Sequence, residues 1–209
     1  MTVLCDECGV ACANMYTVYN DNRQALIIDP CDAFMAEMHI NRLSLTVKAI
    51  LLTHAHYDHA SALCDIEKIV PGVPSFIHIL DGPLLSDPSK NVAQLFGIPD
   101  FSAKCSVYIE DKDIITAGDF SIRVIHTPGH TPGSVCYLVG DNLFTGDTLF
   151  CSNIGRCDLY GGSYKNMSES LKKVKSLDPL LKIYPGHGPS TTLKFEIENN
   201  FFLSDDSNL

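Results

Sequence analysis

Three histidines and an aspartate lie within six residues, in the segment His54-Ala55-His56-Tyr57-Asp58-His59. The segment follows an apolar run from Val47 to Leu52, which is typical of a buried strand that leads into a loop. Side chains alternate along extended backbone, so His54 and His56 fall on one side and can bind one ion together. Asp58 and His59 come where the chain turns, which predicts a neighbouring ion. Imidazole and carboxylate donors without thiolate favour zinc, iron or manganese.

Three more candidate ligands follow strand-like segments farther along the chain. Each lies in a loop bounded by glycine, where the backbone can approach an ion closely. They are His130 in Thr127-Pro128-Gly129-His130, Asp147 in Phe144-Thr145-Gly146-Asp147, and His187 in Tyr184-Pro185-Gly186-His187. The chain therefore offers seven candidate ligands, namely His54, His56, Asp58, His59, His130, Asp147 and His187.

This pattern resembles the metallo-β-lactamase superfamily, and the whole chain is similar to the short relatives of glyoxalase II within it. The similarity runs from about residue 14 to about residue 202, and includes Asn14-Met15-Tyr16, Ile28-Asp29-Pro30, Gly146-Asp147-Thr148-Leu149-Phe150 and Ile154-Gly155-Arg156. The resemblance implies that His54, His56 and His130 bind a first divalent metal ion, and that Asp58, His59 and His187 bind a second. It also implies that Asp147 bridges the two ions, and that Asp29 holds the histidine loop in place from behind the ligands.

Candidate substrate-binding residues lie in the loop after Asp147. Arg156, Tyr160 and Lys165 are interleaved with glycines that allow this loop to fold over the metal ions. Arg156 and Lys165 can attract a substrate carboxylate, and the resemblance places Arg156 near the substrate carbonyl or the thiol arm. For Tyr160 and Lys165, a solvated position at the start of a helix is an equal alternative.

Two features depart from the family pattern. Cys31 stands where many relatives have glycine after the Asp-Pro turn, which predicts a turn of different shape. Glyoxalase II has a further helical domain with basic residues for the glutathione carboxylate, whereas one helical segment, about 191–203, follows His187 here. The resemblance therefore supports thioester chemistry more firmly than it supports glutathione as the carrier.

The expected activity is hydrolysis of a small-molecule thioester of the S-lactoylglutathione type by a binuclear centre, with zinc as the first choice of metal and iron or manganese as alternatives. A water shared by two dications loses a proton near neutral pH, and the resulting bridging hydroxide attacks the thioester carbonyl. The carbonyl oxygen can lean on one cation while negative charge develops on it. Asp58 orients the nucleophile and, with Asp147, forms the expected catalytic pair of carboxylates.

The superfamily leaves other functions open. Iron-dependent persulfide dioxygenases also resemble the chain, and they use one metal ion held by two histidines and one aspartate. A lactonase is less favoured because the tyrosine that those relatives carry three residues after the bridging aspartate is Phe150 here. A β-lactamase is less favoured because those enzymes lack the carboxylate that Asp147 supplies. A protein without catalysis is disfavoured because all seven candidate ligands are present.

The elements that must position these residues alternate between strand-like and helix-like patterns. Such an order can pack as two sheets face to face with helices outside. The resemblance implies the α/β class and the four-layer αββα metallo-β-lactamase fold, with the metal ions at the open edge between the sheets. We expect strands at about 14–20, 24–29, 47–52, 105–109, 113–116, 119–126, 134–140, 142–146 and 181–184, and helices at about 32–44, 58–68, 165–176 and 191–203, with short helices between 81 and 103.

Composition limits the remaining choices. At 209 residues and 45% hydrophobic content the chain can bury one large core, so we expect a single domain over residues 1–209. A net charge of −10 without a basic cluster disfavours nucleic acid as a partner. No apolar stretch is long enough to span a bilayer, and the start resembles no secretion signal, so we expect a cytoplasmic protein without a membrane partner. The sequence does not predict the oligomeric state.

Nine cysteines are spread along the chain. An odd number of cysteines without a secretion signal indicates reduced thiols. Cys5, Cys8 and Cys12 lack a fourth ligand nearby in the sequence, so we expect them to lie in a first edge strand and its turn without binding metal.

Overall fold

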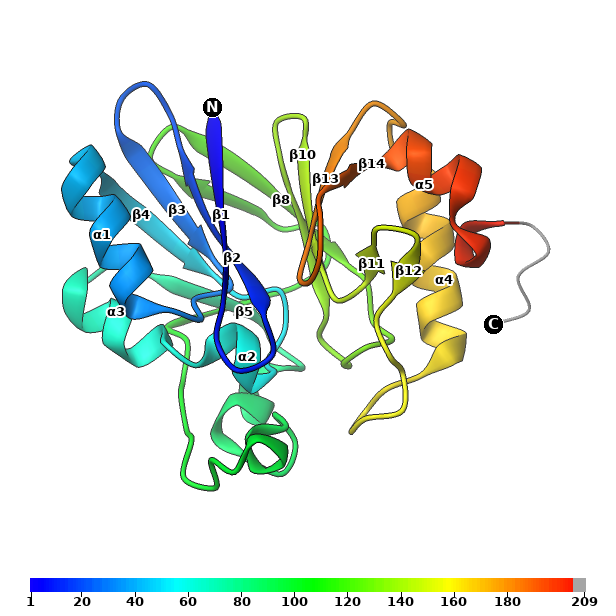
Figure 1. The fold of residues 1–209 in the computed structure, drawn as a ribbon, viewed down its shortest axis with the longest axis horizontal. Helices are drawn as coiled ribbons and strands as arrows, with labels where there is room; N and C mark the ends of the chain where they lie inside the picture. The colour runs from blue at the N-terminus through cyan, green and yellow to red at the C-terminus, as the bar shows by residue number, and fades with distance from the viewer. Residues whose placement is uncertain (205–209) are drawn as a thin grey trace.

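Two six-stranded sheets pack face to face in the structure, a computed structural model that describes residues 1–204 (Figure 1). The first sheet has the order β1-β2-β3-β4-β5-β6, antiparallel from β1 to β3 and parallel from β3 to β6. Its strands are β1 (Thr2–Cys8), β2 (Ala13–Tyr19), β3 (Gln24–Ile28), β4 (Thr46–Leu51), β5 (Ser75–His78) and β6 (Val107–Ile109).

The second sheet has the order β14-β13-β10-β9-β8-β7, and a separate two-stranded hairpin, β11 and β12, follows β10. Strands β8 and β10 are both antiparallel to β9, and β13 is parallel to β10, so β8, β10 and β13 run in one direction. The strands are β7 (Ile114–Ala117), β8 (Phe120–His126), β9 (Val135–Val139), β10 (Asn142–Gly146), β11 (Leu149–Phe150), β12 (Asn153–Ile154), β13 (Lys182–Pro185) and β14 (Thr191–Thr192).

Helices cover the outer face of each sheet (Figure 1). Helices α1 and α3 lie on the first sheet, and α4 and α5 lie on the second, which gives the four layers of an αββα sandwich. The helices are α1 (Ala33–Leu43), α2 (Tyr57–Ala60), α3 (Leu63–Ile69), α4 (Tyr164–Lys175) and α5 (Leu193–Asn199), with the 3-10 helices η1 (Gly82–Ser86), η2 (Ala93–Phe96) and η3 (Phe201–Leu203).

Alternation along the strands assigns each apolar residue to a layer. On β3, Leu26 and Ile28 face the core between the sheets, while Ile27 packs beneath α1 and α3. On β10, Phe144 faces the core between the sheets and Leu143 packs beneath α4 and α5. Because side chains point to opposite faces in turn, a strand covered on both faces is apolar throughout. The predicted α/β fold with two sheets inside and helices outside is confirmed.

Some predicted elements differ from the structure. The helix expected at about 58–68 is divided into α2 and α3, because the Ala62 N–H and the Ser61 hydroxyl donate to carbonyls of the Pro30-Cys31 turn. The helix expected at about 191–203 begins at Leu193, after the short strand β14, and ends at Asn199 before η3. Strand β5 and the hairpin β11–β12 were not predicted, because segments of two to four residues carry too little periodicity.

None of the helices within residues 1–204 combines the length and apolar character that crossing a bilayer requires. Strand β1 lies at the edge of the first sheet, as predicted for the segment with Cys5 and Cys8.

A buried carboxylate ties the hairpin β11–β12 to α5. Glu196 is fully buried, and its two oxygens accept hydrogen bonds from the Ser152 N–H at 2.8 Å, the Asn200 amide at 2.9 Å and the Thr191 hydroxyl at 2.8 Å. A buried carboxylate is stable only when such donors replace water. The contact therefore holds the hairpin beside the open edge of the sandwich.

We predict that Glu196→Ala lowers the free energy of unfolding by about 3 kcal/mol, because it leaves buried donors without an acceptor. Urea denaturation measures this change. Glu198→Ala on the exposed face of the same helix is the control, since its carboxylate lies 4.0 Å from the Lys194 ammonium in an exposed pair, and we expect it to change stability by less than about 0.5 kcal/mol. Equal effects of the two variants would contradict the role given to Glu196.

Candidate metal centre

Four strands deliver their C-terminal loops to one edge of the sandwich. β4 ends at Leu51 before the histidine cluster, and β8, β10 and β13 end before the loops that carry His130, Asp147 and His187. Because β8, β10 and β13 run in one direction, their loops emerge on the same side. The topology thus brings together side chains that are far apart in the sequence.

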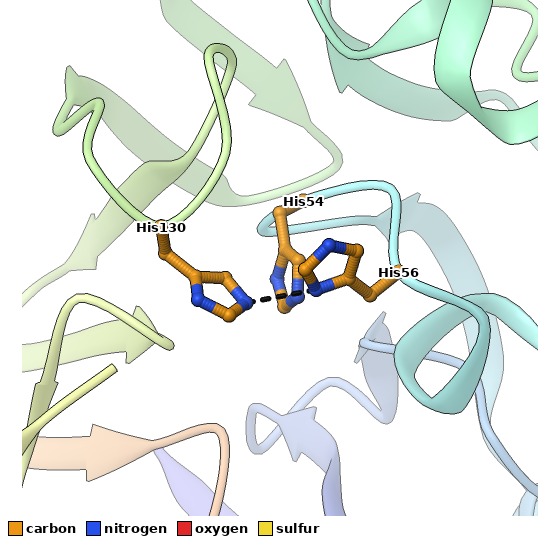
Figure 2. A group of neighbouring side chains, drawn as sticks. All are labelled: His54, His56 and His130. Atoms are coloured by element: carbon orange, nitrogen blue, oxygen red, sulfur yellow. Dashed lines mark hydrogen bonds between the residues drawn. The ribbon is translucent and has the colours of Figure 1, made fainter. Parts of the chain in front are cut away.

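His54, His56 and His130 form a first group of three buried imidazoles. Figure 2 shows the three rings meeting from two different loops, with each ring directed towards the other two. The ring centroids lie 4.8 Å apart for His54 and His56, 4.8 Å for His54 and His130, and 4.5 Å for His56 and His130. His130 Nε2 lies 2.8 Å from His56 Nδ1. Ring nitrogens at this separation can coordinate one ion.

Asp58, His59 and His187 form a second group beside the first. Asp58 and His59 lie in the short helix α2, which begins directly after His56, and His187 follows β13. His59 Nε2 lies 3.2 Å from His187 Nε2, and His187 Nε2 lies 3.3 Å from Asp58 Oδ2. These atoms can also hold one ion.

Asp147 lies between the two groups. One carboxylate oxygen, Oδ1, is 3.4 Å from His59 Nε2, and the other, Oδ2, is 3.4 Å from His130 Nε2. Asp147 thus faces one ring from each group. A carboxylate in this position could contact ions held by either group.

Two glycines allow the loops to approach this closely. A side chain at Gly186 would collide with Asp147 Oδ1, and a side chain at Gly146 would collide with the Thr53 hydroxyl. Gly146 also has φ +48°, in the left-handed region that glycine adopts without strain. The Gly-Asp and Gly-His pairs in the sequence therefore have a steric cause.

Unsatisfied polar atoms mark the centre as a binding site for cations. Within residues 1–204, four buried side-chain nitrogen or oxygen atoms have no hydrogen-bond partner, and three of them are His54 Nε2, His56 Nε2 and Asp147 Oδ1. Leaving such groups buried without a partner is costly. Nitrogen and carboxylate oxygen are donors that suit a divalent transition metal, so the residues present fit a metal ion.

The ring nitrogens that point away from the centre have protein partners. His130 Nδ1 donates to the Arg156 carbonyl at 2.7 Å, and His187 Nδ1 donates to the Cys12 carbonyl at 3.2 Å. Donation through Nδ1 leaves Nε2 free to coordinate metal and fixes the direction of each ring.

Asp29 anchors the histidine loop from below. Its Oδ1 accepts the Thr53 N–H at 2.8 Å, and its Oδ2 accepts the Thr53 hydroxyl at 2.8 Å and His59 Nδ1 at 3.0 Å. The Thr53 hydroxyl in turn lies 3.1 Å from His54 Nδ1. One carboxylate thus orients His59 directly and His54 through Thr53.

Asp81 is a second buried anchor, which the sequence analysis did not single out. Its carboxylate accepts the Ala55 N–H at 2.9 Å, the Thr131 hydroxyl at 2.8 Å and the Gly133 N–H at 2.6 Å. It therefore joins the loop of His54 and His56 to the loop of His130. Burial raises the pKa of Asp81 to about 6, although these hydrogen bonds oppose the rise. The Asp81-Gly82-Pro83 turn was the only signal in the sequence.

Electrostatics divide the two groups of ligands. Burial and neighbouring rings lower the pKa values of His54 and His56 well below the ordinary range, so both are neutral near pH 7. Burial also opposes a charge on His59, but the carboxylates of Asp147, Asp58 and Asp29 raise its pKa to about 10. The pKa of His187 is raised too, because its hydrogen bond to Asp58 outweighs burial. His59 therefore holds a proton near pH 7, whereas His54 and His56 do not.

A cavity of about 390 Å³ opens above the candidate ligands. Its volume lies in the range of small-molecule sites, and apolar side chains form most of its wall. It is lined by Ala11, His56, Asp58, Val92, Leu95, Phe96, His130, Asp147, Phe150, Ile154, Arg156, Leu159 and His187.

Of the three predicted substrate-binding residues, one lines the cavity and two do not. Arg156 lines the cavity, with its side chain 59% exposed. Tyr160 and Lys165 are exposed and do not line it; the Tyr160 ring lies 5.3 Å from the Lys90 ammonium, and Lys165 lies in the first turn of α4. Sequence reasoning missed Val92, Leu95 and Phe96, since apolar residues in a proline-rich segment give no signal of a binding wall.

Known proteins share this arrangement of sheets. The profile of the metallo-β-lactamase superfamily matches residues 10–187. The chain is similar to the solved structure of the BLEG-1 B3 metallo-β-lactamase, with a TM-score of 0.92, 37% identity and coverage of 97% of this chain and 100% of that one. It is also similar to TTHA1623 in a di-iron-bound form, with a TM-score of 0.86, 34% identity and coverage of 96% and 100%.

Two curated relatives match over nearly their whole length. The "Probable metallo-hydrolase YqgX" of Bacillus subtilis is 36% identical over 197 residues, which is 92% of each chain. The "Hydroxyacylglutathione hydrolase GloC" of Haemophilus influenzae is 32% identical over 200 residues, which is 93% of this chain and 94% of GloC. The chain belongs to the metallo-β-lactamase superfamily. Within that superfamily it is a metallo-hydrolase with a His and Asp centre for divalent metal ions.

We predict that the two groups release different numbers of protons when zinc binds at pH 7. His54 and His56 are already neutral, whereas His59 must lose a proton to coordinate a cation, and the raised pKa of His187 adds to the release. The affinity of the second equivalent of zinc should therefore rise about tenfold per pH unit for each proton released, while that of the first changes less. Calorimetric titrations in buffers of different ionisation enthalpy measure the release.

The variant His187→Asn should reduce this proton release, whereas His39→Asn, outside the centre on α1, should leave it unchanged. Binding of both equivalents without proton release would contradict the assignment.

We also predict that Asp81→Ala weakens zinc binding to the first group at least tenfold, because the two loops that carry its ligands lose their common acceptor. The same variant should lower the free energy of unfolding by about 3 kcal/mol. Competition with a chromophoric chelator and urea denaturation measure the two effects. Asp65→Asn, with a side chain that is 63% exposed, is the control. Unchanged zinc affinity in Asp81→Ala would show that the anchor is unnecessary.

Proposed function

We propose that the chain is a binuclear thioester hydrolase, which cleaves a small acyl thioester of the S-lactoylglutathione type into a carboxylic acid and a thiol. Zinc is the proposed metal, with iron or manganese as alternatives. The similarity to GloC, whose name describes a hydroxyacylglutathione hydrolase, supports this choice of reaction.

The position of Asp147 carries the proposal. Its two oxygens each lie 3.4 Å from a ring of a different histidine group, so the seven candidate ligands are contiguous, which supports a centre for two ions. A single-ion enzyme would need only three of these ligands. Phe150 stands edge-on to His187, with ring centroids 5.9 Å apart, so no tyrosine hydroxyl reaches the centre from position 150. This observation disfavours a lactonase.

We assign the ligands in two sets with one shared member. His54, His56 and His130 would hold one ion, Asp58, His59 and His187 the other, and Asp147, which also lies close to His54 and His59, would contact both. Two divalent cations bound there would supply a nucleophilic hydroxide at neutral pH and a Lewis acid for the carbonyl oxygen.

The chain's own residues would prepare the substrate and the attacking water. Burial opposes ionisation of Asp58, but His59 and His187 lower its pKa far below the ordinary value, so its carboxylate stays ionised and can orient the water. The apolar wall, including Phe96 and Phe150, excludes other water from the reacting bond. As the C–O bond forms, the C–S bond breaks, and the sulfur leaves as a thiolate that needs little help from an acid.

Two other activities, β-lactam hydrolysis and persulfide dioxygenation, are to be compared directly with thioester hydrolysis. BLEG-1 is described as a B3 metallo-β-lactamase, which favours testing β-lactam hydrolysis. The di-iron form of TTHA1623 favours testing iron. An iron-dependent persulfide dioxygenase, which uses one ion, is the alternative from a different reaction class.

The test is to purify the chain without added metal, quantify zinc, iron and manganese, and assay thioesters, lactones, a β-lactam and glutathione persulfide in parallel. We expect two ions per chain and thioester hydrolysis as the dominant activity. Asp147→Asn should lower kcat by at least about a hundredfold, because it removes the carboxylate shared by both groups. Asp141→Asn, exposed before β10, should retain full activity.

Several outcomes would overturn the proposal. One iron per chain with oxygen consumption on glutathione persulfide would identify a dioxygenase. Thioester turnover that survives Asp58→Ala and His59→Ala would show that a single ion suffices. A kcat/KM for the β-lactam above that for every thioester would identify a β-lactamase.

A further inference from the structure

The cavity above the candidate ligands has an apolar rim. Of the lining residues that the structure describes, Arg156 is the only charged or polar one that is not also a candidate metal ligand. Leu95 projects from η2 on one side with 72% of its surface exposed, and Phe150 and Leu159 line the other side. An exposed leucine at the mouth of a cavity is a natural contact for an aliphatic group.

Arg156 is already paired. Its Nε donates to Asp158 Oδ1 at 2.7 Å and its Nη2 donates to Asp158 Oδ2 at 2.8 Å, the two-point contact in which guanidinium binds carboxylate best. The hydrogen bonds from Arg156 lower the pKa of Asp158 to about 2, so the pair stays ionised near neutral pH. A substrate carboxylate would have to displace Asp158, and exchanging one carboxylate for another gains little free energy.

Other nearby cations do not replace Arg156. Lys90 donates to Asp87 at 2.8 Å and lies over the Tyr160 ring, and Lys165 does not line the cavity. The net charge of −10 further disfavours an anionic ligand. Glutathione carries two carboxylates, and no unpaired cation among the described lining residues is available for either.

The wall beside Leu95 is held in a strained conformation. Val92, a β-branched residue, has φ +63°, where such side chains are rarely found. The neighbouring Asn91 is fully buried, donates to the Leu85 carbonyl at 3.0 Å and accepts the Ala93 N–H at 3.1 Å. Strain of this kind persists where surrounding contacts impose it, and it often accompanies binding sites. The apolar wall is thus a fixed surface.

We infer that the centre takes aliphatic acyl thioesters carried on an uncharged thiol arm, with Leu95 contacting the acyl chain and Asp158 excluding carboxylate-bearing carriers by occupying Arg156. This inference rests on the proposed thioesterase function. It names a specificity-determining pair, Leu95 and Asp158, outside the candidate ligands.

The test uses thioethers, which lack the scissile carbonyl and so report binding without turnover. We would measure the Kd values of S-hexyl-N-acetylcysteamine, S-methyl-N-acetylcysteamine and S-hexylglutathione by calorimetry on the zinc-loaded protein. The hexyl compound should bind more tightly than the methyl compound, by up to about fourfold for each methylene that becomes buried, which corresponds to about 0.8 kcal/mol per methylene. S-hexylglutathione should bind at least about tenfold more weakly than S-hexyl-N-acetylcysteamine.

Two variants test the pair. Leu95→Asn should weaken binding of S-hexyl-N-acetylcysteamine at least about fivefold and leave the methyl compound unchanged. Leu180→Asn, a leucine that is 77% exposed and does not line the cavity, is its control. Asp158→Asn should free Arg156 and tighten binding of S-hexylglutathione about fivefold or more, with less than a twofold change for S-hexyl-N-acetylcysteamine. Asp141→Asn makes the same change of charge outside the cavity and should change neither Kd.

Parallel assays of S-hexanoyl-N-acetylcysteamine and S-lactoylglutathione separate the inferred substrate preference from the thioesterase function itself. Hydrolysis of both, with S-lactoylglutathione preferred and S-hexylglutathione bound more tightly, would overturn the inference and leave the thioesterase function standing. If the protein hydrolyses neither compound, the thioesterase function is overturned. Equal binding of the methyl and hexyl thioethers, or no response to Asp158→Asn, would overturn the inference whatever the catalytic result.

Discussion

The candidate metal centre depends on the buried carboxylate of Asp29. This residue lies at the end of β3 with φ +53°, and its two oxygens accept the Thr53 N–H, the Thr53 hydroxyl and the His59 ring. A histidine loop without this acceptor would have three donors to satisfy inside the protein. By satisfying them, Asp29 turns an otherwise irregular loop into a rigid holder for ligands on both sides of Asp147.

Crowding of the candidate ligands also sets the electrostatics of the centre. Asp29 and Asp81 fix the loop that carries His54, His56, Asp58 and His59 and the loop that carries His130, and Asp147 and His187 complete the seven crowded donors. Burial and the neighbouring rings keep His56 neutral, whereas three carboxylates favour the charged form of His59, so these residues, three positions apart, have opposite protonation tendencies. The centre thus contains the neutral rings of His54 and His56 beside the ring of His59, which holds its proton.

In the proposed function, the apolar rim would add specificity to the metal chemistry. The rim consists of residues of η2, Phe150 of β11 and the segment after β12. Arg156 takes part in both the rim and the metal centre, because its carbonyl accepts the His130 ring and its guanidinium is held by Asp158. The backbone of one residue therefore supports the metal centre while its side chain faces the substrate cavity.

The sequence by itself indicated two sheets with helices outside, from the order of its strand-like and helix-like segments, and its histidine spacing and glycine turns pointed to the seven candidate ligands, because these are local signals. The αββα fold and the assignment of each ligand came from the family resemblance. It did not reveal Asp81, the short strand β5, the division between α2 and α3, or the apolar wall around Leu95. Each of these depends on contacts between segments distant in the chain: Asp81 is an anchor only because Ala55 and Gly133 donate to it. Tertiary structure also decided that the Arg156 guanidinium is paired with the Asp158 carboxylate. The folded loop sets this contact, and no periodic pattern in the sequence indicates it.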